Sequence, residues 1–167
     1  MRILALLLFV GIMSCQPVSI PTESEVKIDV HSVLDEWHKA ASEANYDNYF
    51  GKMDSISIFI GTDASENWTK SEFEAFSKPY FDNGKAWDFR VLERNVYMNS
   101  DRDVVWFDEL LKTWMGTCRG SGVVVKSETD WKIKHYVLSL TIPNDDIQKV
   151  IAATKERDSV FQSNFLK

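Results

Sequence analysis

Apolar residues recur along most of the chain with either the period of a helix or the alternation of a strand. Between Val30 and Ala44 they fall at helical spacing, and Thr69 with Glu72 forms a capping box before a second helical segment. From Trp87 onward the pattern changes to strand alternation, interrupted by short polar turns. The predicted elements are a helix from Asp29 to about Asn45, a helical turn at 46–51, a strand at 55–60, a helix at 69–82, strands at 87–98, 104–111, 115–127 and 131–142, and a final helix capped by Asn144.

The three strands between Val104 and Ile142 carry apolar residues in both alternation registers. A sheet with one solvated face would alternate apolar with polar residues, so both faces of this sheet are expected to be covered. The order of elements predicts one α+β domain, with helices on one face of a bent antiparallel sheet. The opposite face would be covered by a second copy in a homodimer, or by the final helix folding back over it.

The composition limits both the size of the fold and its partners. With 167 residues, 44% of them hydrophobic, the chain can enclose one sizeable core and has little length left for a second domain. The net charge is −6, and no block of Lys or Arg is longer than a pair. Nucleic acid and anionic membrane surfaces are therefore not expected partners, because both require a positive patch.

The N-terminus has the pattern of a signal peptide. Arg2 precedes the apolar run from Ile3 to Met13, which is too short to span a bilayer core that requires ~20 helical residues. The sequence Ile12-Met13-Ser14-Cys15 resembles the bacterial lipobox, whose cysteine is lipidated and becomes the mature N-terminus; the alternative is an ordinary cleaved signal peptide. The predicted organisation is a signal peptide at 1–14, a lipidated Cys15 with a flexible tether at 15–27, and a folded domain at 28–167. The protein is then expected in the bacterial cell envelope, in the periplasm or anchored to the outer membrane, or is otherwise secreted.

Two stretches resemble the SnoaL-like branch of the nuclear transport factor 2-like superfamily. One is the loop Ile60-Gly61-Thr62-Asp63 with the following Trp68, and the other runs from Trp106 through Gly122 to Tyr136. The resemblance covers about residues 30–142 and implies a cone-shaped, curved antiparallel sheet with helices on its concave face. It also implies a pocket between sheet and helices, and a dimer through the other sheet face. It specifies function less closely, because this superfamily includes isomerases, dehydratases, cyclases and many proteins with no known activity.

Three polar side chains on the predicted strands are candidates for catalysis or ligand contact. Asp108 would serve as a general acid or base if it were buried, since desolvation raises the pKa of a carboxyl group; alternatively it pairs with Arg119 or Lys112. His135 could transfer a proton near neutral pH or could be a structural histidine, and Arg119 could bind a carboxylate or form a structural ion pair. A three-residue turn after Ser127 would place Arg119 and His135 on one face of the sheet, and a two-residue turn would separate them.

The aromatic and small residues allow several interpretations. Six tryptophans are many for one domain, and Trp68 and Trp106 could line a pocket, a core or a dimer face. In relatives, the helix end that corresponds to Tyr49 faces the cone mouth. His31 and His38 lie outside the apolar stripe of the first helix and are expected to be solvated. Gly116, Gly120 and Gly122 lie within a strand pattern and indicate bends or close packing. Scattered histidines and the lack of a CxxC motif predict neither a metal nor a cofactor.

These observations predict a secreted or lipid-anchored SnoaL-like domain that binds a small apolar or weakly acidic ligand in the cone pocket, without evident catalysis. One alternative is a small-molecule isomerase, dehydratase or hydrolase that uses Asp108 or His135. Another is a protein-interaction module whose cone is filled by its own aromatic side chains. The candidate ligand contacts are Tyr49, Trp68, Trp106, Asp108, Arg119 and His135.

Overall fold

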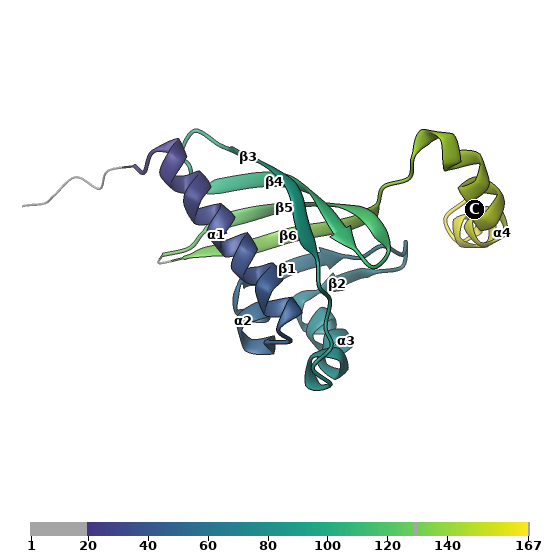
Figure 1. Cartoon of the computed structure of the whole chain (residues 1–167), viewed down its shortest axis with the longest axis horizontal. Coiled ribbons are helices and arrows are strands. Elements are labelled where there is room, and N and C mark those ends of the chain that lie inside the picture. The colour runs from purple at the N-terminus through teal and green to yellow at the C-terminus, as the bar shows by residue number, and fades with distance from the viewer. Residues whose placement is uncertain (1–19, 129, 167) are drawn as a thin grey trace, which may run out of the picture.

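The computed structural model of the chain describes residues 20–128 and 130–166, so Cys15 and the predicted signal peptide lie outside the described residues. Six strands form one curved sheet in the order β2-β1-β6-β5-β4-β3 (Figure 1). The elements are α1 (Glu23–Ser42), α2 (Tyr46–Gly51), β1 (Met53–Ile60), β2 (Asn67–Thr69), α3 (Lys70–Asp82), β3 (Arg90–Met98), β4 (Val104–Thr113), β5 (Gly116–Lys126), β6 (Trp131–Leu140), the 3-10 turn η1 (Asn144–Asp146) and α4 (Ile147–Ser163).

The predicted α+β class is confirmed, with one difference in the sheet. Its neighbouring strands pair antiparallel except β1 and β6, which are parallel. A parallel pair requires a long connection, and here that connection contains α3 and the strands from β2 to β5. The short strand β2 lies between the strand predicted at 55–60 and the helix predicted at 69–82, where no strand was expected, and its Trp68 pairs with Phe59 of β1.

Helix α1 begins earlier than its apolar pattern predicts. The side chain of Thr22 accepts a hydrogen bond from the backbone N–H of Glu25, and the Glu25 carboxylate accepts one from the Thr22 N–H at 2.7 Å. This capping box starts the helix at Glu23, and Val26 is already fully buried in the core. Residues 23–27, which were predicted to belong to a tether, are therefore helical, because the polar composition around Pro21 concealed the first turn.

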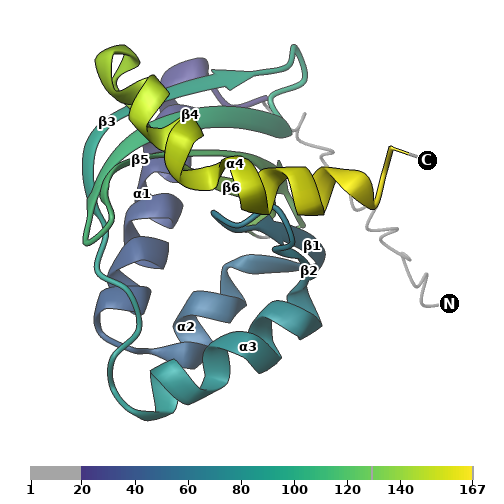
Figure 2. The ribbon, with the colours of Figure 1, turned by 90° about the vertical axis from the view of Figure 1, so that its right-hand side faces the viewer.

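The two faces of the sheet have different neighbours. On β4, Val105, Phe107, Glu109 and Leu111 are buried on the face that α1, α2 and α3 cover, and the alternate residues point to the opposite, outer face. Helix α4 stands beyond the end of the sheet (Figures 1 and 2). None of its residues is buried, and its main contact among the elements is η1. Helix α4 therefore does not fold back over the outer face, which was one of the two expected covers. Asn144 begins η1 and does not cap α4.

The strand registers follow the prediction in part. Val123 opposes His135 and Arg119 opposes Ser139, as a three-residue turn predicts. An irregularity next to Val123 then shifts the pairing, so that Trp131 opposes Lys126 and Ile133 enters the core. A second irregularity lies between Val91 and Glu93 of β3, which begins at Arg90 instead of the predicted Trp87.

Two of the strand glycines permit close packing, as expected. A Cβ atom at Gly120 would lie 2.2 Å from the hydroxyl of Tyr136, and one at Gly122 would lie 2.5 Å from the carbonyl oxygen of His135. Gly116 instead adopts a φ of 101° at the turn between β4 and β5, a conformation that favours glycine. Within the described residues, no helix combines the length and apolar character that a bilayer crossing requires.

Candidate functional site

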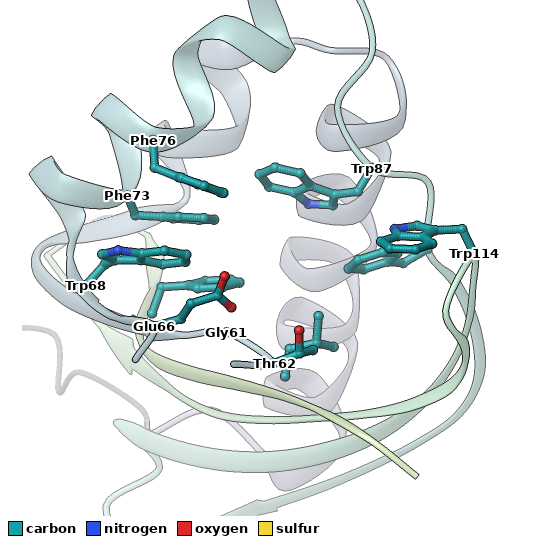
Figure 3. A pocket seen from close by; sticks show the side chains of 11 residues that line it. Gly61, Thr62, Glu66, Trp68, Phe73, Phe76, Trp87 and Trp114 are labelled. Carbon is teal, nitrogen blue, oxygen red and sulfur yellow. The ribbon is translucent and has the colours of Figure 1, made fainter. Parts of the chain in front are cut away.

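An aromatic cleft opens beside α3, between the loop after β1, the segment before β3 and the β4–β5 turn (Figure 3). Its volume is about 120 Å³. An apolar cavity of roughly 150 Å³ holds a benzene molecule, so this cleft has room for a group about the size of one ring. The lining residues are Phe59, Gly61, Thr62, Glu66, Trp68, Phe73, Phe76, Trp87, Phe89, Trp114 and Leu138.

The rings of one wall lie nearly parallel. The Trp68 and Phe76 ring centroids are 4.6 Å apart with planes inclined by 23°, and the planes of Trp68 and Phe73 are inclined by 13°. Figure 3 shows these rings as layers whose edges point into the cleft, with Trp87 and Trp114 across the space. Ring edges carry partial positive charge, so they favour the face of another ring or a hydrogen-bond acceptor.

The local sequence explains how this wall forms. Thr69 and Glu72 cap α3 as predicted, which places Phe73 and Phe76 three residues apart on one side of the helix. Pro79 lies within the helix without ending it, and α3 continues to Asp82. Trp68 belongs to β2 and immediately precedes the capping residue Thr69. Its ring therefore stacks with the rings of Phe73 and Phe76 on α3.

Among the described residues that line the cleft, Glu66 is the one with a charged side chain. Its carboxylate accepts a hydrogen bond from the Asp63 N–H at 3.1 Å, and its carbonyl oxygen accepts one from the Gly61 N–H at 3.0 Å. A Cβ atom at Gly61 would lie 2.1 Å from the Glu66 carboxylate. The glycine therefore lets the carboxylate fold over the loop at the rim of the cleft.

A second polar cluster is buried between α1 and the sheet. Glu109 accepts hydrogen bonds from Arg94 Nε at 2.8 Å and from the Tyr136 hydroxyl at 3.0 Å, and its Oε1 lies 2.7 Å from His38 Nε2. Burial raises the pKa of Glu109, but the hydrogen bonds and positive charge of His38 and Arg94 outweigh burial and lower it. Burial, and then the charge of Glu109, hold the pKa of Tyr136 well above its ordinary value. The cluster thus contains a carboxylate and a neutral phenol.

This cluster joins α1 to β3 and β4, and sequence reasoning missed it. His38 was expected to be solvated, yet only 6% of it is exposed, because the inward carboxylate of Glu109 requires a partner on α1. The signal in the sequence is Glu109 itself, which shares the inward register of β4 with Phe107 and Leu111. The cluster lies close to the cleft, because the ring centroid of His38 is 6.5 Å from that of Phe89, which lines the cleft.

The predicted site residues divide between the two sides of the sheet. Trp68 lines the cleft, and Tyr49 lies in the core behind it with 1% exposure. The other four residues share the outer face, where Arg119 Nη1 lies 3.1 Å from Asp108 Oδ1, and Trp106 and His135 both oppose Val123. The expected convergence of all six in the cone pocket is therefore corrected, because Trp106 and Asp108 occupy the outward register of β4. The four outer-face residues are Trp106, Asp108, Arg119 and His135.

The sequence pattern of the SnoaL-like domain matches residues 30–143, from within α1 to the end of the sheet. The chain belongs to the SnoaL-like family. This confirms the resemblance drawn from Trp68 and from the run between Trp106 and Tyr136. Among curated proteins, none matches this SnoaL-like chain.

Solved structures share the fold of this SnoaL-like domain at low sequence identity. A nuclear transport factor 2-like protein of unknown function from Pseudomonas putida KT2440 is 10% identical with a TM-score of 0.62, over 74% of this chain and 92% of that chain. A candidate aromatic ring hydroxylase from Novosphingobium aromaticivorans is 12% identical with a TM-score of 0.62, over 74% and 94%. A candidate dehydratase of the nuclear transport factor 2-like family from Streptomyces avermitilis is 9% identical with a TM-score of 0.62, over 73% and 100%. At these identities the likeness extends to the fold alone.

Proposed function

We propose that this SnoaL-like domain binds a small, planar, apolar compound in the aromatic cleft. The observation that carries the proposal is the exposure of large rings at the cleft rim, where Trp114 is 83% and Phe76 is 43% exposed. Exposed aromatic rings that converge on one cleft are typical of a binding site, because a ligand that covers them removes apolar surface from water. The near-parallel planes of Trp68, Phe73 and Phe76 suit a flat ligand.

Glu66 restricts the polar chemistry of this ligand. A carboxylate at the rim accepts a hydrogen bond from an O–H or N–H group and repels an anion. The ligand is therefore neutral and a weak acid at most, such as a phenol or an N–H heterocycle. Arg119, which could have neutralised an anionic ligand, lies on the opposite side of the sheet.

Titration with indole tests this proposal by ligand-observed NMR and calorimetry. Trp114→Ala should weaken indole binding by about tenfold, because it removes one aromatic wall. Trp106→Ala is the matched control, since Trp106 is also exposed but lies on the outer face. Loss of binding in Trp106→Ala with unchanged binding in Trp114→Ala would place the ligand on the outer face and refute the cleft proposal.

Catalysis is not part of this proposal. His38 and Glu109 form a pair suited to proton transfer, but neither of them lines the cleft. The alternative of an isomerase, dehydratase or hydrolase that uses Asp108 or His135 would require a reaction on the open outer face, where Asp108 pairs with Arg119.

We also propose a homodimer and a lipid anchor. The outer face carries exposed apolar side chains such as Tyr97 and Trp106, whose rings stack at 6.3 Å, and α4 does not cover them. A twofold interface of roughly 800 Å² per partner would remove this patch from water.

The lipobox-like sequence before Cys15 supports lipidation, with α1 starting only at Glu23 and so leaving a short connection between anchor and fold.

A further inference from the structure

Helix α4 carries an apolar stripe that the rest of the described chain leaves uncovered. None of its residues is buried, although Ile151 is 48% exposed and Phe165, in the turn after the helix, is 72% exposed with its ring 5.2 Å from Phe161. A helix with a single apolar side normally packs that side against another element. The stripe consists of Ile147, Val150, Ile151, Thr154 and Phe161, which lie on one side at the spacing of successive helical turns.

The link between β6 and α4 directs the helix away from the outer face of its own sheet. The sheet pairing holds as far as Thr141, whose backbone N–H and side-chain hydroxyl donate to the carbonyl oxygen of Thr117 at 3.1 and 2.8 Å. Only Ile142 and Pro143 separate this pairing from η1. Pro143 has φ −57° and ψ 138°, and a residue before proline is also restricted to extended backbone. Two extended residues do not reverse the chain, so the stripe does not reach the outer face of the same molecule.

The outer face has a row of side chains that a helix of this length can cover. By strand register, Tyr97, Trp106, Val123, His135 and Ile58 form this central row across β3, β4, β5, β6 and β1. Tyr97 is 49% and Trp106 is 47% exposed. Five strands at a spacing of about 4.8 Å give the row a length of about 19 Å. A helix of 17 residues is about 25 Å long, so α4 can span the row from end to end.

The charges of α4 favour a protein surface over a lipid surface as the partner of the stripe. Asp158 follows Thr154 by four residues and Ile151 by seven, so it lies on the same side of the helix. A carboxylate in the contact is costly against lipid and requires a cation or a donor. The charged residues of α4 are three cations and two carboxylates, which is not the strongly basic face that anionic lipids attract. The outer face offers Arg119, whose side chain is 51% exposed beside Asp108.

We propose that the two copies of the homodimer exchange their C-terminal helices, so that α4 of each copy lies across the central row of the other copy. This inference rests on the proposed homodimer and names the element that forms its interface. A short link that prevents an element from closing on its own chain favours such an exchange. Asp158 then meets Arg119 of the partner subunit, and the apolar stripe covers Tyr97 and Trp106. The uncovered helix and the uncovered face thereby become the two halves of one contact, which occurs twice in the dimer.

Light scattering on the chain without residues 1–19, which contains every element of the fold, tests this exchange. Val150→Glu together with Phe161→Glu should weaken the dimer at least about a hundredfold and give the mass of one chain, because two apolar contacts are lost. Ala152→Glu with Ser159→Glu is the matched control, since it adds the same charge on the opposite side of α4. The control should keep the mass of two chains. Circular dichroism should show that both variants are folded, because no residue of α4 is buried within one chain.

The outcomes separate the exchange from the dimer itself. A dimer that persists in Val150→Glu with Phe161→Glu overturns the exchange and leaves the homodimer proposal standing. A control that dissociates as readily as this variant also overturns the exchange, because the stripe is then not the contact. A wild-type mass of one chain overturns both proposals, and binding of that chain to phosphatidylcholine vesicles would assign the stripe to a lipid surface.

A mixture of two variants distinguishes contact between α4 and the central row from contact between like surfaces. Trp106→Arg keeps the stripe and alters the row, whereas Val150→Glu with Phe161→Glu alters the stripe and keeps the row. In an exchanged pair of one chain of each kind, one intact stripe meets one intact row. Native mass spectrometry should therefore find mixed dimers at a concentration where each variant alone is a single chain. If α4 packed on α4, or sheet on sheet, each such contact would include an altered surface, so an absence of mixed dimers overturns the inference.

Discussion

Replacing Glu109 should reveal how strongly the buried cluster holds α1 on the sheet. Glu109→Ala removes the acceptor of Arg94 Nε, of the Tyr136 hydroxyl and of His38. The Arg94 side chain is 3% exposed and, among the residues that the structure describes, would retain Asp35 at 2.8 Å as its acidic partner. Breaking a buried ion pair by removing one partner costs about 3–5 kcal/mol, so we expect a loss of unfolding free energy in this range.

Glu109→Gln should be milder, because glutamine keeps the shape and one acceptor oxygen. If that oxygen faces Arg94, the amide N–H groups face His38 and the Tyr136 hydroxyl, which can both accept when the imidazole is neutral. The variant then loses the charge of the ion pair but leaves fewer groups without partners. We expect a cost of about 1–3 kcal/mol, between the wild type and Glu109→Ala.

Urea denaturation followed by far-ultraviolet circular dichroism measures these differences. With a slope of about 2 kcal/mol per molar urea, a loss of about 4 kcal/mol lowers the midpoint by about 2 M. Glu43→Gln is the control, because Glu43 is exposed and lies 3.7 Å from Lys39. It should change the unfolding free energy by less than about 0.5 kcal/mol. A Glu109→Ala midpoint as high as that of Glu43→Gln would refute the structural role of the cluster.

Three further predictions concern pH, membrane attachment and assembly. Because the pKa of Glu109 is lowered in the folded state, the unfolded chain binds a proton at this carboxylate first as the pH falls. The stability advantage of wild type over Glu109→Gln should therefore be full above about pH 5 and decline as the pH falls through the folded pKa. Urea midpoints of both proteins at pH 7 and pH 3.5 measure this advantage, and a difference that is the same at both pH values contradicts the prediction. Mass spectrometry of the native protein should find lipid on Cys15, and Cys15→Ala should move the protein from the membrane to the soluble fraction; an unmodified N-terminus beyond Cys15 excludes the anchor. Light scattering on the chain without residues 1–19 should give the mass of two chains, and Trp106→Arg, on the outer face, should give one. A wild-type mass of one chain at micromolar concentration, independent of concentration, would rule out the dimer.

The sequence predicted elements whose signals are local. The signals of the Thr69–Glu72 capping box, of the helix predicted at 69–82 and of the alternation in the central strands all act over a few residues, and the structure has each of these features. The start of α1 was missed although Thr22 and Glu25 form the same kind of box, because proline and serine residues before it suggested a tether. Local capping chemistry was in this case a better guide than composition.

The site was harder to predict because it depends on which face of a strand points inward. Both registers of β4 carry aromatic residues, so the sequence could not tell that Phe107 is inside and Trp106 outside. The prediction that Asp108 and His135 line the pocket assumed that their strands turn these residues toward the helices, whereas both residues face the outer side of the sheet. The cleft itself combines Trp68, Trp87 and Trp114, which belong to distant segments and share no periodic pattern.

The parallel pairing of β1 with β6 has a consequence for the order of folding. Strands β3 to β6 form antiparallel neighbours along the chain, whereas Phe59 of β1 must meet Tyr136 of β6 across most of the domain. Long-range contacts of this kind require closure of a large loop and form slowly. During synthesis, the aromatic side chains of α2, β1 and α3 have no β6 to pack against until the chain is nearly complete. The cleft, whose lining includes Phe59 of β1 and Leu138 of β6, is therefore expected to be the last part of the domain to assemble.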